Sequence, residues 1–520
     1  MKPLKILLYC MFTALLACNP KSKTTQQNPN IILIYADDLG RGMLSSYGQK
    51  HLTTPNIDKL ANEGMRFSNV YGCMFCAPAR ASLLNGMHDC HKQIWSLTDA
   101  GIYKELGKSL TYNQIEEKIH KLAPPENEGE VFLADVAKRQ GYITAEFGKL
   151  EWGFATTAER VKSHGWDYHF GFYDHVRCHG FYPPFLFENG EVVSIEGNTH
   201  ADCGKTASFE SPEEYKKRWD MTGKAVYSDK IIMDKLLAFM ENNNPQKTGQ
   251  PFFIHLPSQL PHGPISVPEV HPELKNNKAL TEFEKEYGTM VKILDEDVGK
   301  IYAKCKELGI LENTIIIFTG DNGHEVYTRQ AGKTEHGRAT LDGGKFDDIH
   351  TKFYSEINGD VFDGNDGMAG LKRSNWEGGV RVPLIWYWKG KIKPGTQSDQ
   401  LVANYDLLNT IAELTGGEIV KGKDSKSYAQ TLLGNKSEEH KYTVFASVMG
   451  PAIVTNDGWK LRYYTRKKVF QLYNLKDDYR EEKVLNARFP EKMEALKSIL
   501  LKECDGDWKN GGYPKFSIIK

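Results

Sequence analysis

The sequence predicts an α/β fold: a large, mixed, mostly parallel sheet flanked by helices, followed by a small C-terminal antiparallel α+β domain. Three runs, at 31–35, 251–256 and 314–318, are apolar almost throughout, as in strands buried on both faces. Helical patterns lie between and beyond these runs, at 54–63, 130–140, 228–242, 281–308 and 404–415. Strands that alternate with helices favour a parallel sheet covered on both sides.

The pattern changes beyond residue 418. Short β-prone runs alternate with turns there, at 442–448, 452–455, 460–464 and 469–473, and a last helix is predicted at about 490–503. We therefore predict one main domain over 29–418 and a smaller antiparallel-sheet and helix domain over 419–520.

Composition excludes one class of function. The 66 Lys and Arg residues balance 67 Asp and Glu residues, a net charge of −1, so bulk electrostatics cannot hold nucleic acid to this chain. A chain of 520 residues also buries a large core without disulfide or metal staples.

The N-terminus predicts export. Lys2 and Lys5 precede an apolar run at 6–17, which is too short to span a membrane and is typical of a secretory signal. The run ends at Cys18 in a pattern that resembles the bacterial lipobox. We predict a lipoprotein signal at 1–18 and a polar tether at 19–28. The protein would then be a lipoprotein of the bacterial cell envelope, on its periplasmic or cell-surface face, held to the membrane by lipid on Cys18. A plain secretory signal is the alternative.

Polar side chains follow three of the predicted strands. Asp37 and Asp38 come after the first, Asp321 and Asn322 after another, and His262 lies in a Pro-His-Gly-Pro turn after the third. Ligands bind beyond the carboxyl ends of parallel strands, so these side chains predict a site. Ligands that are all oxygen indicate a hard cation, Ca²⁺ or Mg²⁺.

A short helix is predicted to begin at Cys76. Pro78 suits its first turn and Gly86 its end. Backbone N–H groups at a helix N-terminus favour an anion there, and Arg80, one turn on, can reach back to the same place.

The run from Cys76 to Gly86, C-x-P-x-R followed by A-x-L-L-x-G, resembles the signature of the type I sulfatases of the alkaline phosphatase-like superfamily. Seven other segments are similar to motifs of that family and occur in the family's order, at 32–40, 141–149, 186–190, 261–264, 319–323, 372–383 and 472–475. Seven ordered matches make coincidence implausible. The resemblance identifies 29–418 as a sulfatase catalytic domain.

The resemblance implies the chemistry. In that family a maturase oxidises the cysteine to formylglycine (3-oxoalanine), whose hydrated aldehyde attacks a sulfate ester and then expels sulfate by elimination. The implied metal ligands, usually to Ca²⁺, are Asp37, Asp38, Cys76, Asp321 and Asn322. Arg80 would hold the diol, Lys149 and Lys372 would neutralise sulfate oxygens, and His262 would protonate the leaving oxygen. Together with the predicted export, the resemblance implies a sulfated saccharide as substrate.

One position departs from the family. The family commonly has G-K-W-H, but here Gly148-Lys149 is followed by Leu150 and Glu151, so the histidine is missing. Either Glu151 takes its place or two residues are inserted before Trp152. The candidate substitutes are His88, His91, His179 and His324, which with Glu151 form the predicted substrate contacts.

The sequence also permits other interpretations. A phosphate or phosphonate ester hydrolase of the same superfamily would suit the same metal and cations, and an unconverted Cys76 would leave a sulfoglycan-binding lipoprotein without activity. The C-x-x-C of Cys73 and Cys76 leaves the acid pairs unexplained if it is read as a redox motif. With His88 and His91 it also follows the order of a zinc finger, but the predicted helix occupies the gap and the last spacing is short.

Overall fold

The computed structural model describes residues 28–92, 101–122, 129–150, 152–206, 216–329, 332–333 and 352–512. Cys18 and Glu151 lie outside these ranges, so the signal peptide, the lipid on Cys18 and the role of Glu151 stay predictions. Among the described residues, no helix is long and apolar enough to cross a membrane.

A ten-stranded sheet forms the centre of the molecule, with the order β13-β2-β12-β9-β1-β8-β4-β5-β6-β7. Its strands are β1 (Asn30–Ala36), β2 (Met65–Phe67), β4 (Ile143–Gly148), β5 (Tyr168–Gly171), β6 (Phe185–Glu188), β7 (Glu191–Ser194), β8 (Phe252–Pro257), β9 (Thr314–Gly320), β12 (Leu384–Trp388) and β13 (Thr396–Ser398). The central five, β9-β1-β8-β4-β5, are parallel, whereas β12, β6 and β7 run antiparallel to their neighbours. The predicted mixed, mostly parallel sheet is confirmed.

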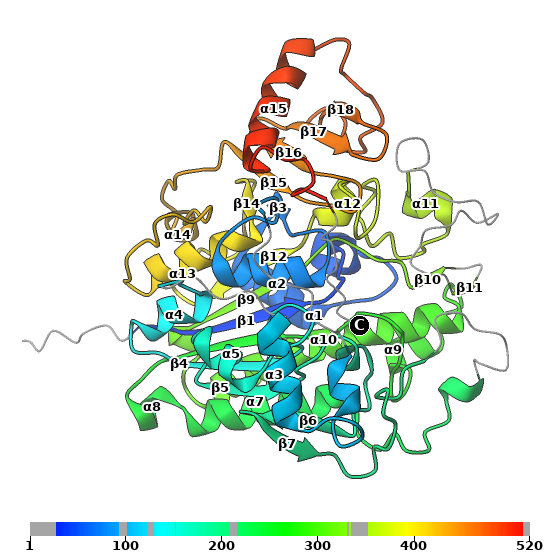
Figure 1. Cartoon of the computed structure of the whole chain (residues 1–520), viewed down its shortest axis with the longest axis vertical. Coiled ribbons are helices and arrows are strands. Elements are labelled where there is room, and N and C mark those ends of the chain that lie inside the picture. The colour runs from blue at the N-terminus through cyan, green and yellow to red at the C-terminus, as the bar shows by residue number, and fades with distance from the viewer. Residues whose placement is uncertain are drawn as a thin grey trace, which may run out of the picture.

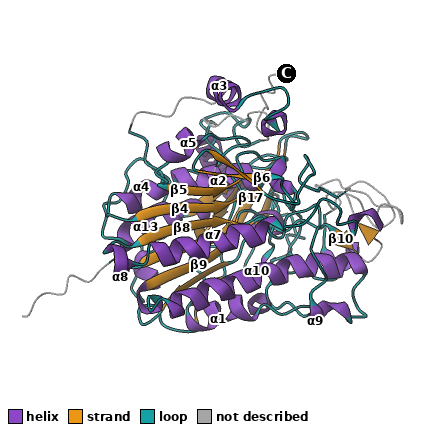
Figure 2. Cartoon of the chain, turned by 90° about the horizontal axis from the view of Figure 1, so that it is seen from below, coloured by secondary structure: helices purple, strands orange, loops and turns teal. Residues whose placement is uncertain are grey.

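Strand β1 shows why the sheet is covered on both faces. All seven of its residues are buried. Ile31, Leu33 and Tyr35 belong to one hydrophobic cluster, and the alternate residues Ile32 and Ile34 belong to a second cluster on the other face. Helices α2, α4 and α13 pack on the first face and α1, α7 and α10 on the second (Figure 2).

The helices extend over these residues: α1 (Pro55–Glu63), α2 (Cys76–Asn85), α3 (Tyr112–Leu122), α4 (Leu133–Lys138), α5 (Ala158–Ser163), α7 (Ser228–Asn242), α8 (Pro245–Thr248), α9 (Pro272–Lys275), α10 (Glu282–Glu307), α11 (Ser355–Asn358), α12 (Glu377–Val380), α13 (Leu407–Leu414), α14 (Ala429–Leu432) and α15 (Pro490–Glu503). Two small sheets pair β3 (Val70–Tyr71) with β14 (Val402–Ala403) and β10 (Thr328–Arg329) with β11 (Gly332–Lys333).

A second, four-stranded antiparallel sheet lies at one end of the molecule (Figure 1). Its strands are β15 (Tyr442–Phe445), β16 (Ala452–Thr455), β17 (Trp459–Tyr464) and β18 (Val469–Asn474), each paired with the next. Helix α15 packs beside them, as the turn-rich pattern beyond residue 418 predicts.

The seven described cysteines are all buried, and none of them forms a disulfide. The thiols are therefore available as single side chains, including Cys76.

Two carboxylates face each other between the packed helices α7 and α10. Burial raises the pKa of Asp229 to about 6, and burial together with the charge of Asp229 raises the pKa of Asp297 well above its usual value. Lys300 Nζ lies 2.7 Å from Asp297 Oδ1 and compensates only in part. The folded protein thus holds a proton that the unfolded chain releases above about pH 4, so stability falls as the pH rises through these raised values.

Replacing Asp297 with asparagine keeps a side chain that can hydrogen-bond to Asp229 and removes one buried negative charge. We expect the Tm of Asp297→Asn to exceed that of the wild type by about 1–3 °C at about pH 8, and to match it at about pH 4.5, where the pair is already protonated. Thermal melts at both pH values measure this. Asp234→Asn, at an exposed position on α7, makes the same charge change and should give no gain. An equal gain at both pH values would contradict the assignment.

Candidate active site

Four oxygen-bearing side chains meet where β1 and β9 end. The register pairs Ala36 with Gly320, so the residues that follow, Asp37 and Asp321, become neighbours. Oxygens of Asp37, Asp38 and Asp321 lie within 4.8 Å of one another. Asp321 Oδ1 accepts hydrogen bonds from the backbone N–H groups of Asp38 (3.0 Å) and Asn322 (2.8 Å), and Asn322 Nδ2 donates to Asp38 Oδ1 (2.8 Å). These bonds aim the remaining oxygens into one small volume.

The oxygens that remain suit a cation. Among the described residues, Asp37 Oδ1, Asp321 Oδ2 and Asn322 Oδ1 are buried and have no hydrogen-bond partner. Burial and the charges of Asp37 and Asp38 raise the pKa of Asp321 well above its usual value. Bare, crowded oxygens are what a hard divalent cation takes as ligands, so the donor set fits Ca²⁺ or Mg²⁺.

Two buried ammonium groups approach the same acids. Lys149, directly after β4, contacts Asp37, and Lys372, in the loop before α12, lies 2.6 Å from Asp38 Oδ1. Burial opposes the charge of Lys149, but Asp37 outweighs it and raises the lysine's pKa. Asp38 raises the pKa of Lys372 against burial in the same way. Both side chains therefore carry a positive charge.

Cys76 is the first residue of α2 and only 2% exposed. The helix ends at Gly86, whose φ of 70° suits a glycine C-cap, so both predicted ends of the helix are confirmed. Ligand atoms of Cys76, Asp37 and His262 lie within 4.8 Å of one another. Burial raises the pKa of the Cys76 thiol despite the nearby lysines, so the side chain is a neutral thiol.

Arg80 lies one turn further along α2. Its guanidinium is fully buried, with Nη2 3.6 Å from Asp37 Oδ2 and 3.9 Å from Asp321 Oδ2. None of its three nitrogens donates a hydrogen bond to a described residue. A buried guanidinium with free donors fits an oxygen-rich group, such as a diol at position 76 or a sulfate.

Three histidines form one side of the site. His262 Nε2 is 3.3 Å from Asp38 Oδ2 and 3.3 Å from Lys372 Nζ. Its ring stacks on His179 with centroids 4.1 Å apart, and His179 Nε2 lies 3.2 Å from Lys149 Nζ. Burial lowers the pKa of His262 to about 3, against the pull of Asp38 and Asp37, so the ring is neutral here.

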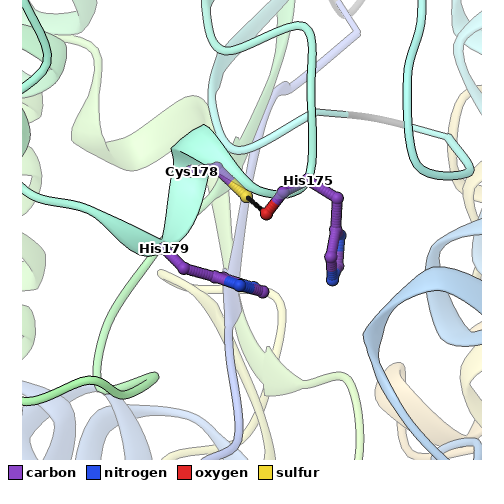
Figure 3. Close-up of side chains that lie close together, drawn as sticks. All are labelled: His175, Cys178 and His179. Atoms are coloured by element: carbon purple, nitrogen blue, oxygen red, sulfur yellow. Dashed lines mark hydrogen bonds between the residues drawn. The ribbon is translucent and has the colours of Figure 1, made fainter. Parts of the chain in front are cut away.

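His175 is the closest histidine to the cysteine, with Nε2 3.5 Å from Cys76 Sγ. It shares one turn with Cys178 and His179, and both imidazoles project into the site while Cys178 Sγ turns back to the carbonyl oxygen of His175, 3.1 Å away (Figure 3). His175 was not among the predicted site residues, although its place four residues before His179 was a usable signal in the sequence. Tyr327, which donates to Asp38 Oδ2, was not predicted either, and no sequence pattern distinguishes it.

The structure brings together all nine residues predicted as metal ligands or catalytic groups, and His179 with them. The other predicted substrate contacts lie elsewhere or outside the described residues. His324 Nε2 is 3.4 Å from the buried Asp360, and its ring packs against Gly40 and Gly364. His88 and His91 contact Asp424 beyond the far end of α2. Glu151 is not described, and the roles of all of these residues stay predictions.

Comparisons with known proteins agree with this geometry. The family described as "Sulfatase" matches residues 29–417, and the family described as "N-sulphoglucosamine sulphohydrolase, C-terminal" matches residues 368–505. The N-acetylgalactosamine-6-O-sulfatase of Bacteroides thetaiotaomicron is 28% identical over 94% of this chain and 96% of that protein. Arylsulfatase A of Bos taurus is 27% identical over 85% of this chain and 76% of that protein. A solved structure from work on glycosaminoglycan metabolism by Bacteroides thetaiotaomicron superposes with a TM-score of 0.66, at 25% identity, over 92% of this chain and 100% of that one.

Proposed function

This chain belongs to the sulfatase family and is a sulfuric ester hydrolase, and from that premise we propose that it removes sulfate from carbohydrate through a nucleophile made from Cys76. The observation that carries the proposal is the buried Arg80 guanidinium beside Cys76, which donates no hydrogen bond to a described residue and faces the acid cluster. The names of the similar proteins, an N-acetylgalactosamine-6-O-sulfatase among them, support a sulfated sugar as the substrate.

The charge of each site residue determines its proposed role. Asp37, Asp38, Asp321 and Asn322 would hold the cation, which supplies a positive charge for a sulfate oxygen when bound. Lys149 and Lys372 are ammonium groups and would neutralise the other oxygens. Arg80 would orient the hydroxyl-bearing side chain that replaces the thiol at position 76.

His262 would donate a proton to the leaving oxygen. Its ring is neutral in the structure, and the negative charge of a bound sulfate ester would raise its pKa. Proton donation matters most when the leaving group is a poor one, such as a sugar alkoxide.

We expect His262→Ala to lower kcat/KM for a sugar sulfate by about 10²–10³-fold and for a p-nitrophenyl sulfate by about tenfold or less. Steady-state kinetics on the two substrates measures the difference. Equal losses on both would argue against His262 as the acid.

His175 would take over the work of the missing family histidine. Its Nε2 atom is the imidazole nitrogen that contacts Cys76 Sγ, and burial together with the charge of Lys149 lowers its pKa, so it stands as a neutral base. It could hold the proton of a hydroxyl at position 76.

In His175→Ala we therefore expect kcat to fall by about 10²–10³-fold with KM little changed. His179→Ala, four residues along the same turn, removes a contact to Lys149 and should raise KM instead. A loss in His175→Ala that appears in KM alone would overturn the assignment.

Mass spectrometry of the tryptic peptide 67–80 tests the nucleophile directly, in protein made beside a working formylglycine-forming maturase. An aldehyde in place of the Cys76 thiol supports the proposal. An unmodified Cys76, with conversion shown on a control sulfatase, would favour the sulfoglycan-binding alternative. Faster turnover of a phosphodiester than of its matched sulfate would favour the phosphate ester hydrolase.

A further inference from the structure

A second cluster of histidines and carboxylates lies apart from the active site, beyond the other end of α2. His88 and His91 follow that helix, Asp424 lies in the loop after α13, and Glu503 is the last residue of α15. The rings of His88 and His91 stack with centroids 3.9 Å apart. Three segments distant in sequence thus place four metal-binding side chains together.

We propose that His88, His91, Asp424 and Glu503 form a zinc-binding site. The edges of the cluster are 3.0 Å from His91 Nε2 to Asp424 Oδ2, 3.6 Å from His88 Nε2 to the same oxygen, and 3.2 Å from His88 Nε2 to Glu503 Oε2. Ligand atoms on a zinc tetrahedron with bonds of about 2.0–2.1 Å lie about 3.3–3.4 Å apart. These three contacts bracket that value. Ligand atoms of His88, His91 and Asp424 all lie within 4.8 Å of one another, whereas Glu503 is outside that group and contacts His88, so its carboxylate would have to turn toward the other two to become the fourth ligand.

The donor types select the metal. Imidazole nitrogen mixed with carboxylate oxygen suits Zn²⁺, whereas Ca²⁺ and Mg²⁺ take oxygen ligands only. The active-site acids therefore suit one class of metal and this cluster another.

Neighbouring groups hold the ligands in the required orientation. Asp505 Oδ1 lies 3.1 Å from His91 Nδ1, which leaves Nε2 for the metal. Tyr442 donates to Glu503 Oε1 (2.8 Å), which leaves Oε2, and the backbone N–H of His88 donates to Asp424 (2.9 Å). A carboxylate on the far nitrogen of a metal-binding histidine is the usual support of such a ligand.

The site differs from the zinc-finger order in the sequence. Cys76 faces His175 at the other end of α2, and Cys73 contacts Asn404 and Asp89, so neither thiol joins the two histidines in the cluster. Carboxylates from Asp424 and Glu503 take the places of the thiols. Zinc here would join the end of α15 to the turn after α2 and so fasten the C-terminal domain to the main sheet.

Titration calorimetry with Zn²⁺ alone tests the site, on the full chain stripped of transition metals and kept in excess Ca²⁺. We expect the wild type to bind one equivalent that His91→Ala and Asp424→Asn each weaken by at least about 100-fold. Zinc should raise the Tm of the wild type and not that of these variants. His91 is partly exposed and Asp424→Asn is isosteric, so circular dichroism should show both folded.

Two control variants test whether side chains outside the proposed site bind the zinc. His271→Ala removes a histidine that pairs with a single carboxylate, Glu296 at 3.3 Å, and should leave the equivalent in place. Cys90→Ser removes the thiol between His88 and His91 and should also leave it in place. Zinc binding that Asp424→Asn leaves unchanged, or that Cys90→Ser removes, would overturn the proposal.

Discussion

Cys76→Ala is expected to lower the turnover of sulfate esters by about 10⁴-fold or more, in a protein that still folds. The reason is position: Cys76 begins α2, its Sγ faces His175, and Arg80, Lys149 and Lys372 converge on the same point. Among the described cysteines, only Cys76 has a ligand atom grouped with those of the site's acids. Steady-state assays with a sulfated sugar and with p-nitrophenyl sulfate measure the loss.

Loss of one buried sulfur should cost only about 1–2 kcal/mol of stability, so inactivity would not come from unfolding. Cys73→Ala is the matched control, because Cys73 is buried three residues upstream and contacts Asn404 instead of the site. That variant should keep its turnover. Activity of Cys76→Ala near that of the wild type would refute the proposal that the nucleophile is made from Cys76.

Lys460→Met is expected to lower the free energy of unfolding by about 3–5 kcal/mol, the largest stability loss predicted for this chain. Lys460 on β17 is fully buried, with Nζ 2.8 Å from Glu377 Oε1 and 2.8 Å from Glu481 Oε1. Tyr71 (2.8 Å) and Arg381 (3.1 Å) contact the other oxygen of Glu377. Without Lys460, two buried carboxylates would face each other across the contact between the two sheets.

The loss should depend on pH. Burial and the charge of Glu377 already raise the pKa of Glu481, and removing Lys460 raises it further. Protonation of Glu481 relieves the repulsion, so the loss should be smaller at about pH 5 than at about pH 8. Shifts in Tm and in the urea midpoint measure it. Lys59→Met removes an exposed pair with Glu63 and should change stability by less than about 0.5 kcal/mol. Equal losses in the two variants would contradict the network's role.

Site residues were predicted most accurately from the sequence where they come directly after a buried strand. Asp37, Asp38, Asp321 and Asn322 come within two residues of β1 and β9, so the parallel register alone brings them together. The direction of β12 was not predictable, because Leu384–Trp388 is buried like a central strand and only its antiparallel partners reveal its place.

Histidines on loops were the hardest to assign. His88 and His91 follow Cys76 closely in sequence, but the ten residues of α2 set them about 15 Å away. His175 reaches Cys76 only because the chain turns back after β5, a path that no local pattern specifies. Position along a helix or after a strand could be predicted, whereas the path of a loop depends on tertiary packing.

The burial of Cys76 also bears on when the proposed oxidation of its side chain would take place. A modifying enzyme must surround the side chain that it oxidises, and in the folded chain α2 and the sheet leave that side chain 2% exposed. The proposed conversion of Cys76 would therefore come before folding, and the two processes would compete for the same stretch of nascent chain. A substitution that makes α2 dock on the sheet sooner would yield a more stable protein and fewer active molecules.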